Sequence, residues 1–330
     1  MENTILLSCE CPGLPAGSQT VAGRRVCLEV LPAGLTIAER LARISLEQRL
    51  ATVGLVTLLT DVLDRDTLVL LKARLPNLRL IANYAVGFNN IDVQAAKELS
   101  LAVTNTPHVL ADATADLTLA LMLMVARRLC DGANEIQTQG RFAGWSPTYG
   151  LGIDLKGRTL GIVGLGDIGR KVAARAKVFG MNVVSLQSLR AGGIREDDVP
   201  RLSETEFLAA TDVLSLHCPL TPQTRSWLNA SRIAQLKRGS IVINTARGDV
   251  VDEAALASAL QSGHLYGAGV DVFCGEPVVS DVLRAAPNLV ILPHLGSATV
   301  ETRTAMGAKV LENVSALLAG QMPLPTQVNL

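Results

Sequence analysis

A glycine-rich turn placed directly after a short apolar run is the feature that most constrains how this chain can fold. Residues 159–163 are typical of a buried strand, and the glycines of residues 164–169 follow at once. Residues 168–179 then have helical spacing, and residues 182–186 form a second apolar run. The arrangement predicts a βαβ unit with the pattern G-x-G-x-x-G at its first turn.

Each glycine of this turn has its own physical reason. Gly164 permits a tight turn, Gly166 lets the backbone approach a pyrophosphate, and Gly169 lets the helix pack closely on the strand. The start of the helix adds unpaired N–H groups and a positive dipole end, which suit phosphate oxygens. We therefore expect a dinucleotide-binding turn, with a purely structural glycine turn as the alternative. The expected cofactor-binding residues here are Gly164, Leu165, Gly166, Asp167, Ile168 and Gly169.

The end of the second strand indicates which dinucleotide is preferred. Chains that bind NAD commonly carry an acidic residue about 20 positions after the glycines, where it accepts hydrogen bonds from the ribose 2′-OH. Gln187 stands there instead, followed by Ser188 and Arg190, so no carboxylate would repel a 2′-phosphate. A hydroxyl and a guanidinium could bind that phosphate. This favours NADP(H), with NAD(H) as a further possibility if Gln187 tolerates both and Arg190 is only a solvated loop charge.

Length and composition describe an ordinary globular enzyme. At 330 residues the chain is long enough for two domains, and 48% hydrophobic with 18% charged residues argues against disorder. The 30 basic and 30 acidic residues balance, which argues against a general affinity for nucleic acid or anionic membranes. The apolar stretches at residues 5–7 and 117–126 are too short for a signal peptide or a membrane span, so we expect a cytoplasmic protein.

The cysteines and histidines do not suggest a metal site. No pair of cysteines has CxxC spacing, and the chain has only four histidines, so we expect neither a disulfide framework nor bound zinc. The cysteines are Cys9, Cys11, Cys27, Cys130, Cys218 and Cys274.

The first hundred residues alternate between strand-like and helix-like segments, which predicts an α/β domain with a parallel sheet covered on both faces. The expected strands are residues 4–8, 52–58 and 78–83, and the expected helices are residues 35–44 and 64–74. The loop at residues 85–90 directly follows a strand, and such loops bind ligands at the carboxyl edge of open α/β sheets.

The rest of the chain predicts a second α/β domain. Asn105-Thr106-Pro107 is typical of a crossing between domains, and a long apolar helix is expected at residues 111–129, either as a core element or as a subunit interface. Together with the opening βαβ unit, the later strands make six, as in a doubly wound dinucleotide fold. These later strands are expected at residues 213–217, 240–244, 268–272 and 289–292, with helices at residues 253–261 and 299–318.

Three ionisable residues each follow one of these strands on its carboxyl side, where the nicotinamide should lie: Arg247, Glu276 and His294. Moving a hydride onto a ketone requires a cation to orient the substrate and a proton donor for the developing alkoxide. Arginine suits a carboxylate, histidine supplies the proton, and a neighbouring glutamate favours the imidazolium. Taken singly, each residue also has a plainer interpretation: a phosphate contact, a turn residue and a structural histidine.

Several motifs together resemble the D-2-hydroxyacid dehydrogenase family, and most closely its glyoxylate/hydroxypyruvate reductase branch. The resemblance covers nearly the whole chain and rests on residues 83–92, 105–116, 164–169, 244–252, 269–273 with Glu276-Pro277, and 293–299. The chain departs from the branch at Phe88-Asn89 and at Gln187, which bears on substrate and cofactor preference.

The resemblance implies a division of roles among named residues. His294 and Glu276 would form the acid/base pair, and Arg247 would bind substrate. The substrate-binding set would be the backbone of Val86 and Gly87 together with Arg247, Ser297 and Trp145. Besides the glycine turn, the cofactor-binding set would be Gln187, Ser188, Arg190, Cys218, Pro219, Thr224, Thr245, Ala246 and Asp271.

The family's architecture implies two doubly wound parallel-sheet domains. A flavodoxin-like substrate domain would comprise residues 1–100 and 296–330, with a Rossmann nucleotide-binding domain inserted at residues 101–295. The helix at residues 111–129 and the loop after it would build a homodimer. Trp145 would either reach into the partner's active site or simply pack in the interface.

These observations lead to the expectation of an NADPH-preferring reductase that converts glyoxylate to glycolate and hydroxypyruvate to D-glycerate, with His294 as general acid. One alternative is a dehydrogenase for another D-2-hydroxy acid, for phosphoglycerate or for phosphite. A formate dehydrogenase is disfavoured, because that relative carries glutamine where Glu276 stands. A nucleotide-sensing binding protein, like the corepressors that share this fold, is the alternative from a different class.

Overall fold

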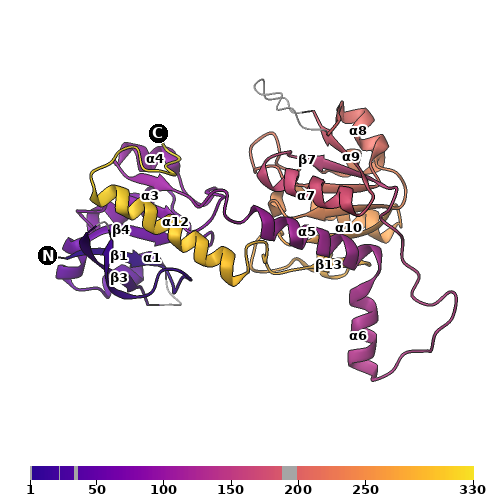
Figure 1. Cartoon of the computed structure of the whole chain (residues 1–330), viewed down its shortest axis with the longest axis horizontal. Coiled ribbons are helices and arrows are strands. Elements are labelled where there is room, and N and C mark those ends of the chain that lie inside the picture. The colour runs from indigo at the N-terminus through magenta and orange to yellow at the C-terminus, as the bar shows by residue number, and fades with distance from the viewer. Residues whose placement is uncertain (1, 22, 33–35, 188–198) are drawn as a thin grey trace. The chain divides into compact units, whose positions relative to one another are not determined.

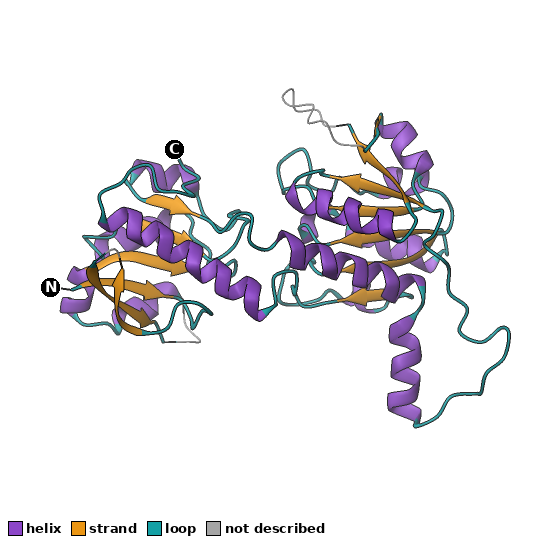
Figure 2. Cartoon of the chain, viewed as in Figure 1, coloured by secondary structure: helices purple, strands orange, loops and turns teal. Residues whose placement is uncertain are grey.

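The computed structural model describes residues 2–21, 23–32, 36–187 and 199–330 (Figures 1 and 2). The chain forms two compact units, Met1–Leu110 with Thr299–Leu330, and Ala111–Ala298. The boundaries expected from the sequence lay at residues 100 and 295. Each unit is an α/β structure built on a mainly parallel sheet, which confirms the predicted fold class.

Within the described residues, the first unit has a six-stranded sheet in the order β2-β3-β1-β4-β5-β6. Apart from the antiparallel edge strand β2, the parallel strands follow the flavodoxin-like order, with the switch point between β1 and β4. The strands are β1 (Asn3–Leu7), β2 (Gly17–Val21), β3 (Arg24–Val30), β4 (Thr52–Thr57), β5 (Leu80–Asn83) and β6 (Ala102–Thr104).

Both faces of this sheet are covered, because alternate side chains of its buried strands enter two separate cores. Leu6, Leu55 and Ile81 pack beneath α1, α3 and α4, whereas Ile5 and Val56 pack on the opposite face beneath α12. The helices are α1 (Ile37–Ala42), α2 (Leu46–Ala51), α3 (Arg65–Arg74), α4 (Val93–Glu98) and α12 (Val300–Leu318). The final helix therefore completes the unit begun by the first 110 residues (Figure 1).

The second unit has a seven-stranded sheet among its described residues, all parallel, in the order β13-β12-β11-β10-β7-β8-β9. The chain moves outward from β7 in one direction through β8 and then in the other through β10, so the switch point lies between β7 and β10. This is the Rossmann arrangement, in which ligands bind at the carboxyl ends of the strands beside the switch point. The strands are β7 (Thr159–Val163), β8 (Asn182–Leu186), β9 (Arg201–Leu202), β10 (Val213–Leu216), β11 (Ser240–Asn244), β12 (Leu265–Val270) and β13 (Leu289–Ile291).

Helices cover both faces of this sheet as well (Figure 2). α5 and α7 pack on one face around Leu160 and Ile162, and α8, α9 and α10 pack on the other around Leu214 and Val242. The helices are α5 (Ala111–Ala126), α6 (Leu129–Gln139), α7 (Asp167–Val178), α8 (Glu204–Ala210), α9 (Ala230–Gln235), α10 (Glu253–Gln261) and α11 (Asp281–Arg284), with a 3₁₀ turn η1 (Gly248–Val250).

The single helix predicted at residues 111–129 is wrong at its carboxyl end. α5 ends at Ala126, Arg128 takes a left-handed conformation with φ 52°, and α6 begins at Leu129. That conformation interrupts the helical hydrogen bonding, and the Arg128 side chain is paired with Asp131 at 2.7 Å. α6 has no buried residue, unlike α5, which lies against the sheet.

The described part of the chain lacks two kinds of feature. No helix there is both long and apolar enough to cross a membrane. No group of three or more His, Cys, Asp or Glu residues there is arranged to hold a metal ion.

Candidate active site

The glycine turn joins β7 to α7 at the switch point, and two of its glycines leave no room for a side chain. Gly164 has φ +97°, and a Cβ there would lie 2.6 Å from the backbone nitrogen of Cys218. A Cβ on Gly169 would lie 2.3 Å from the carbonyl oxygen of Gly164. The turn therefore packs directly on the start of the loop after β10, and α7 packs directly on the turn.

Gly166 differs, because a Cβ at this position would meet no atom within 4 Å. Its backbone is extended and precedes the first turn of α7, where no side chain caps the helix. A side chain at position 166 would therefore obstruct only a bound ligand. The N–H groups at the start of α7 suit the oxygens of a phosphate. These residues fit the pyrophosphate of a dinucleotide.

The other expected cofactor residues follow the strands next to the switch point. Gln187 is exposed at the end of β8, and its N–H donates to the carbonyl of Leu202 at 2.9 Å. Ser188 and Arg190 lie outside the described residues. Cys218 and Pro219 follow β10, and the Thr224 hydroxyl closes that loop by donating to the carbonyl of Pro219 at 2.6 Å.

Thr245, Ala246 and Arg247 follow β11 in a loop that Asn244 holds in place. The Asn244 side chain accepts from the N–H of Ala246 at 3.0 Å and donates to the carbonyl of Arg247 at 2.9 Å. Gly248 then passes so close to Phe273 that a Cβ would lie 2.1 Å from its carbonyl carbon. The loops after β11 and β12 are therefore in direct backbone contact beside Arg247.

His294 and Glu276 form a hydrogen-bonded pair at the same edge. The Nδ1 atom of His294 lies 2.8 Å from Oε2 of Glu276, and Oε1 of Glu276 accepts from the N–H of Phe273 at 3.2 Å. Burial raises the pKa of Glu276, but the bond and charge of His294, the Phe273 N–H and the charge of Arg247 together hold the pKa below its usual value. Since Nδ1 faces the glutamate, Nε2 is the nitrogen left to exchange a proton with substrate.

Arg247 is the cation next to this pair. Burial lowers the pKa of its guanidinium, while the charge of Glu276 acts in the opposite direction. A guanidinium nevertheless keeps its charge in proteins. A partly buried cation, an imidazole and a carboxylate thus lie together at the carboxyl ends of β11, β12 and β13.

Asp271, at the end of β12, ties down the turn that carries His294. Its carboxylate accepts from the N–H groups of Leu295 and Gly296 at 2.6 and 2.8 Å, and its backbone carbonyl accepts from the N–H of His294 at 3.0 Å. Burial raises the pKa of Asp271 although these N–H donors favour the anion. The turn also contains Ser297, which is partly buried.

A further residue, His217 at the end of β10, was not among the candidates from the sequence. Its Nε2 lies 2.8 Å from the Ser215 hydroxyl and its Nδ1 lies 3.3 Å from the Thr245 hydroxyl, which is 3.1 Å from that of Thr118. Burial lowers the pKa of His217 to about 3, so its imidazole is neutral at pH 7. The sequence signal was available, because His217 directly precedes Cys218 at a predicted strand end.

In the first unit, the loop after β5 presents two backbone N–H groups in one direction. The carbonyl of Ala85 accepts from the N–H of Thr106 at 2.9 Å, and that of Val86 accepts from the Asn105 side chain at 2.9 Å. In a trans peptide the N–H points opposite to the carbonyl, so the N–H groups of Val86 and Gly87 point away from residues 105–106. Such parallel donors suit an anion.

Trp145 lies in the segment after α6 and is 84% exposed. The structure of this single chain gives it no place among the other candidate residues.

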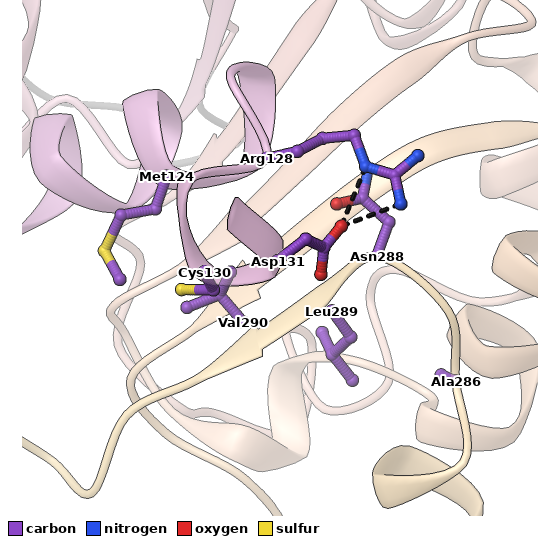
Figure 3. Close-up of a pocket in the computed structure, with 8 residues that line it drawn as sticks. All are labelled: Met124, Arg128, Cys130, Asp131, Ala286, Asn288, Leu289 and Val290. Carbon is purple, nitrogen blue, oxygen red and sulfur yellow. Dashed lines mark hydrogen bonds and ion pairs between the residues drawn. The ribbon is translucent and has the colours of Figure 1, made fainter. Parts of the chain in front are cut away.

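A cavity of about 170 Å³ lies elsewhere in the second unit (Figure 3). It is lined by residues that include Arg128, Asp131 and Asn288, and Asn288 directly precedes β13, so the cavity adjoins the amino end of the strand that His294 follows. The Arg128 guanidinium faces Asp131, with which it is paired. This cavity is therefore separate from the candidate catalytic residues.

Comparison with known proteins identifies the family of the chain. Residues 119–296 match the family model described as D-isomer specific 2-hydroxyacid dehydrogenase, NAD binding domain. A glyoxylate reductase of Thermococcus litoralis is 43% identical over 281 residues, which cover 84% of this chain and 83% of the relative.

Solved structures are similar over the whole length. A glyoxylate reductase from Paecilomyes thermophila is 32% identical, with a TM-score of 0.83 over 99% of this chain and 98% of the other. An NADPH-dependent glyoxylate/hydroxypyruvate reductase from Sinorhizobium meliloti, in complex with NADP and malonate, is 30% identical, with a TM-score of 0.78 over 99% and 97%. The chain belongs to the D-2-hydroxyacid dehydrogenase family of NAD(P)-dependent oxidoreductases and is similar to that family's glyoxylate reductases.

Proposed function

We propose that this enzyme is an NADPH-preferring reductase of small 2-oxo acids, converting glyoxylate to glycolate and hydroxypyruvate to D-glycerate. The observation that carries the proposal is the His294–Glu276 pair at 2.8 Å beside Arg247, at the edge of a nucleotide-binding sheet. The glyoxylate reductases and the glyoxylate/hydroxypyruvate reductase to which the chain is similar support this substrate class.

When bound, the nicotinamide supplies the hydride for the C2 carbonyl. Arg247 holds the substrate carboxylate with its planar fork. In the first unit, the N–H groups of Val86 and Gly87 are a separate pair of donors suited to a carboxylate. His294 holds the proton on Nε2 and delivers it to the carbonyl oxygen as negative charge develops there. Glu276 bonds Nδ1 and keeps the ring oriented.

The cofactor preference rests on the residues at the end of β8 and directly after it. Gln187 offers no negative charge to a 2′-phosphate, and the residues next in the sequence include a hydroxyl and a guanidinium, Ser188 and Arg190. NADPH is therefore the expected reductant in the cell, with NADH used less well.

The decisive assay follows nicotinamide absorbance with glyoxylate and hydroxypyruvate, comparing NADPH and NADH at matched concentrations. We expect kcat/KM to be at least about tenfold higher with NADPH, the factor that about 1.4 kcal/mol of differential binding provides. A preference for NADH would overturn the cofactor proposal and leave the substrate proposal intact. Rapid turnover of D-3-phosphoglycerate or phosphite but not of glyoxylate would overturn the substrate proposal.

The role of His294 is tested with His294→Ala. We expect turnover to fall by about 10²–10⁴-fold, the usual contribution of a positioned acid, while NADPH still binds. Arg225→Ala is a matched control, because Arg225 is an exposed cation paired with Asp249 in the same unit. Undiminished turnover in His294→Ala would rule out its role as general acid.

The proposed enzyme is a homodimer built through α6 and the segment that follows it. α6 buries no residue within the chain, and large apolar side chains are exposed along this part of it. They are Leu129, Ile136, Phe142, Trp145, Tyr149 and Leu151. A surface of this kind is typical of a protein–protein interface. Six unpaired cysteines further favour a reducing compartment such as the cytoplasm.

A further inference from the structure

Two thiols meet at the carboxyl end of β1 in the first unit. The Sγ atoms of Cys9 and Cys11 lie 3.9 Å apart, and no other two cysteines in the described part of the chain are in such contact. Cys9 is partly exposed, whereas Cys11 is 7% exposed and belongs to the core beneath α12. One thiol is thus open to solvent and the other is buried directly behind it.

We propose that Cys9 and Cys11 form a redox-active dithiol, which a peroxide oxidises to an intramolecular disulfide. The Cys9 sulfur attacks one peroxide oxygen, the O–O bond breaks, and Cys9 becomes a sulfenic acid with release of water. The Cys11 sulfur then attacks the Cys9 sulfur, the S–O bond breaks, and the Cys11 proton leaves with the hydroxide as a second water. Two thiols are oxidised by two electrons, and the peroxide is reduced by the same two electrons.

The geometry allows this disulfide to form and to be readily reduced again. The sulfurs must close from 3.9 Å to about 2 Å, which side-chain rotation and a small backbone shift can provide. A ring across one intervening residue, Glu10, is small and strained, and strained or exposed disulfides are the ones most readily reduced again. Burial raises the pKa of Cys11 to about 12, so its sulfur stays protonated at pH 7 and the more exposed Cys9 is the thiol that meets peroxide first.

The pair is connected to the loop that is proposed to bind the substrate carboxylate. Cys11 begins a turn that runs through Pro12 and Gly13, closed by the Leu14 N–H donating to the Cys11 carbonyl at 3.0 Å. The Tyr84 hydroxyl lies 3.0 Å from the Pro12 carbonyl and also donates to the carbonyl of Arg303 in α12, so the two carbonyls share its one proton. Tyr84 directly precedes Ala85 and Val86 at the end of β5.

This turn has little freedom to move without consequence. A Cβ on Gly13 would lie 2.5 Å from the carbonyl oxygen of Thr304 in α12, and one on Gly307 would lie 2.4 Å from the carbonyl oxygen of Pro12. A shift of Cys11 during ring closure is therefore transmitted to Pro12 and to the hydrogen bonding that the Tyr84 hydroxyl shares between Pro12 and Arg303. Oxidation weakens the support of the carboxylate-binding loop and raises the KM for the 2-oxo acid.

Disulfide formation is tested on the full-length enzyme by treating it with hydrogen peroxide and measuring the mass of the peptide that carries both cysteines. We expect that peptide to lose two hydrogens and to regain them with dithiothreitol. Cys9→Ser should abolish the change. Cys27→Ser should not, because Cys27 lies on β3 and its thiol contacts Glu29 rather than another cysteine. A peptide that keeps both thiols, or that gains oxygen at Cys9 without closing, would overturn the proposal.

The predicted effect of the disulfide on substrate binding rests on the proposed reductase activity and is tested by a separate measurement. The oxidised enzyme should show a KM for glyoxylate raised about fivefold, the effect of losing one ordinary hydrogen bond, with unchanged affinity for NADPH. Tyr84→Phe should raise KM similarly without oxidant. A disulfide that forms without any change in KM would refute the link to substrate binding. Failure of the reductase proposal would instead appear as absence of glyoxylate turnover in the reduced enzyme.

Discussion

Asp271 stabilises the turn at His294 through both its backbone carbonyl and its side-chain carboxylate. Its backbone carbonyl accepts the N–H of His294 at 3.0 Å, and its carboxylate accepts the N–H groups of the next two residues, Leu295 and Gly296. His294 itself has φ +57°, a conformation that residues other than glycine seldom adopt. The aspartate therefore stabilises a backbone turn that would otherwise relax, and it does so where the proposed acid must be aimed.

Asp271→Asn should separate turnover from substrate binding. An asparagine offers only one acceptor oxygen, so one of the two N–H groups would face an amide N–H₂ and the turn would loosen. We expect kcat to fall by about 10–10²-fold, because misplacing a catalytic group by a small distance costs this much, while the KM for glyoxylate stays within about twofold. Steady-state kinetics measure both. Asp249→Asn is the control, since Asp249 pairs with Arg225 outside this turn. An unchanged kcat in Asp271→Asn would contradict the positioning role.

The glycines of the turn predict opposite phenotypes for two alanine substitutions. Gly166→Ala places its Cβ where no atom lies within 4 Å, so the unfolding temperature should not change, but NADPH should bind at least about tenfold more weakly. Gly164→Ala forces φ +97° on alanine and a Cβ against Cys218, so it should destabilise the enzyme by about 1–3 kcal/mol. Thermal unfolding and NADPH fluorescence titration distinguish them. Normal NADPH affinity in Gly166→Ala would show that no phosphate approaches this glycine.

His217 predicts an acid-sensitive contribution to stability. Its pKa is about 3 in the folded protein, against 6.5 for an ordinary histidine, so the unfolded chain binds the proton more readily. The contribution of the neutral imidazole to the free energy of unfolding is fully present above about pH 6.5. It is lost as the pH falls toward about 3, by up to about 1.4 kcal/mol per pH unit. Urea unfolding across this range should show a shallower dependence in His217→Gln. Ser215→Ala keeps the imidazole and should retain the steep dependence; equal slopes in the wild type and His217→Gln would refute the assignment.

The sequence was sufficient for the parts of the fold that depend on local pattern. Residues 182–186 and 253–261 have the bounds predicted for them, because strong periodicity and punctuating residues determine both ends. The end of α5 was missed because no glycine or proline marks the left-handed Arg128. The hairpin of β2 and β3 was missed because the edge strand β2 is polar and mostly exposed, although Val26 and Leu28 alternate along β3 and are buried.

The candidate site residues likewise divide into those that a local sequence pattern predicts and those that meet only in the folded structure. Arg247, Glu276 and His294 could be named because each directly follows a predicted strand, and parallel strands bring such residues to one edge. The contribution of His217 depends on side chains from β10, β11 and α5 meeting in space, which no local pattern records. The contact between Cys9 and Cys11 depends on a turn that packs against α12, at the other end of the chain.

Trp145 allows a test of whether one subunit of the proposed homodimer completes the active site of its partner. The side chain is 84% exposed in a segment with several other exposed apolar residues, so within a single chain it has little to stabilise. If it reaches the partner's substrate, Trp145→Ala should raise the KM for glyoxylate about tenfold or more, since truncating a buried aromatic contact commonly costs above about 1.4 kcal/mol, while the enzyme remains dimeric.

Mixed dimers make this test decisive. A subunit carrying Trp145→Ala keeps His294, and a subunit carrying His294→Ala keeps Trp145. If Trp145 acts across the interface, a dimer of one with the other contains one complete site, and a component with wild-type KM should appear on mixing. If Trp145 only packs in the interface, the mixture should keep the KM of Trp145→Ala and sedimentation should show weakened dimers. Because His294→Ala alone supplies no proton donor, any wild-type component must come from a site assembled by two chains.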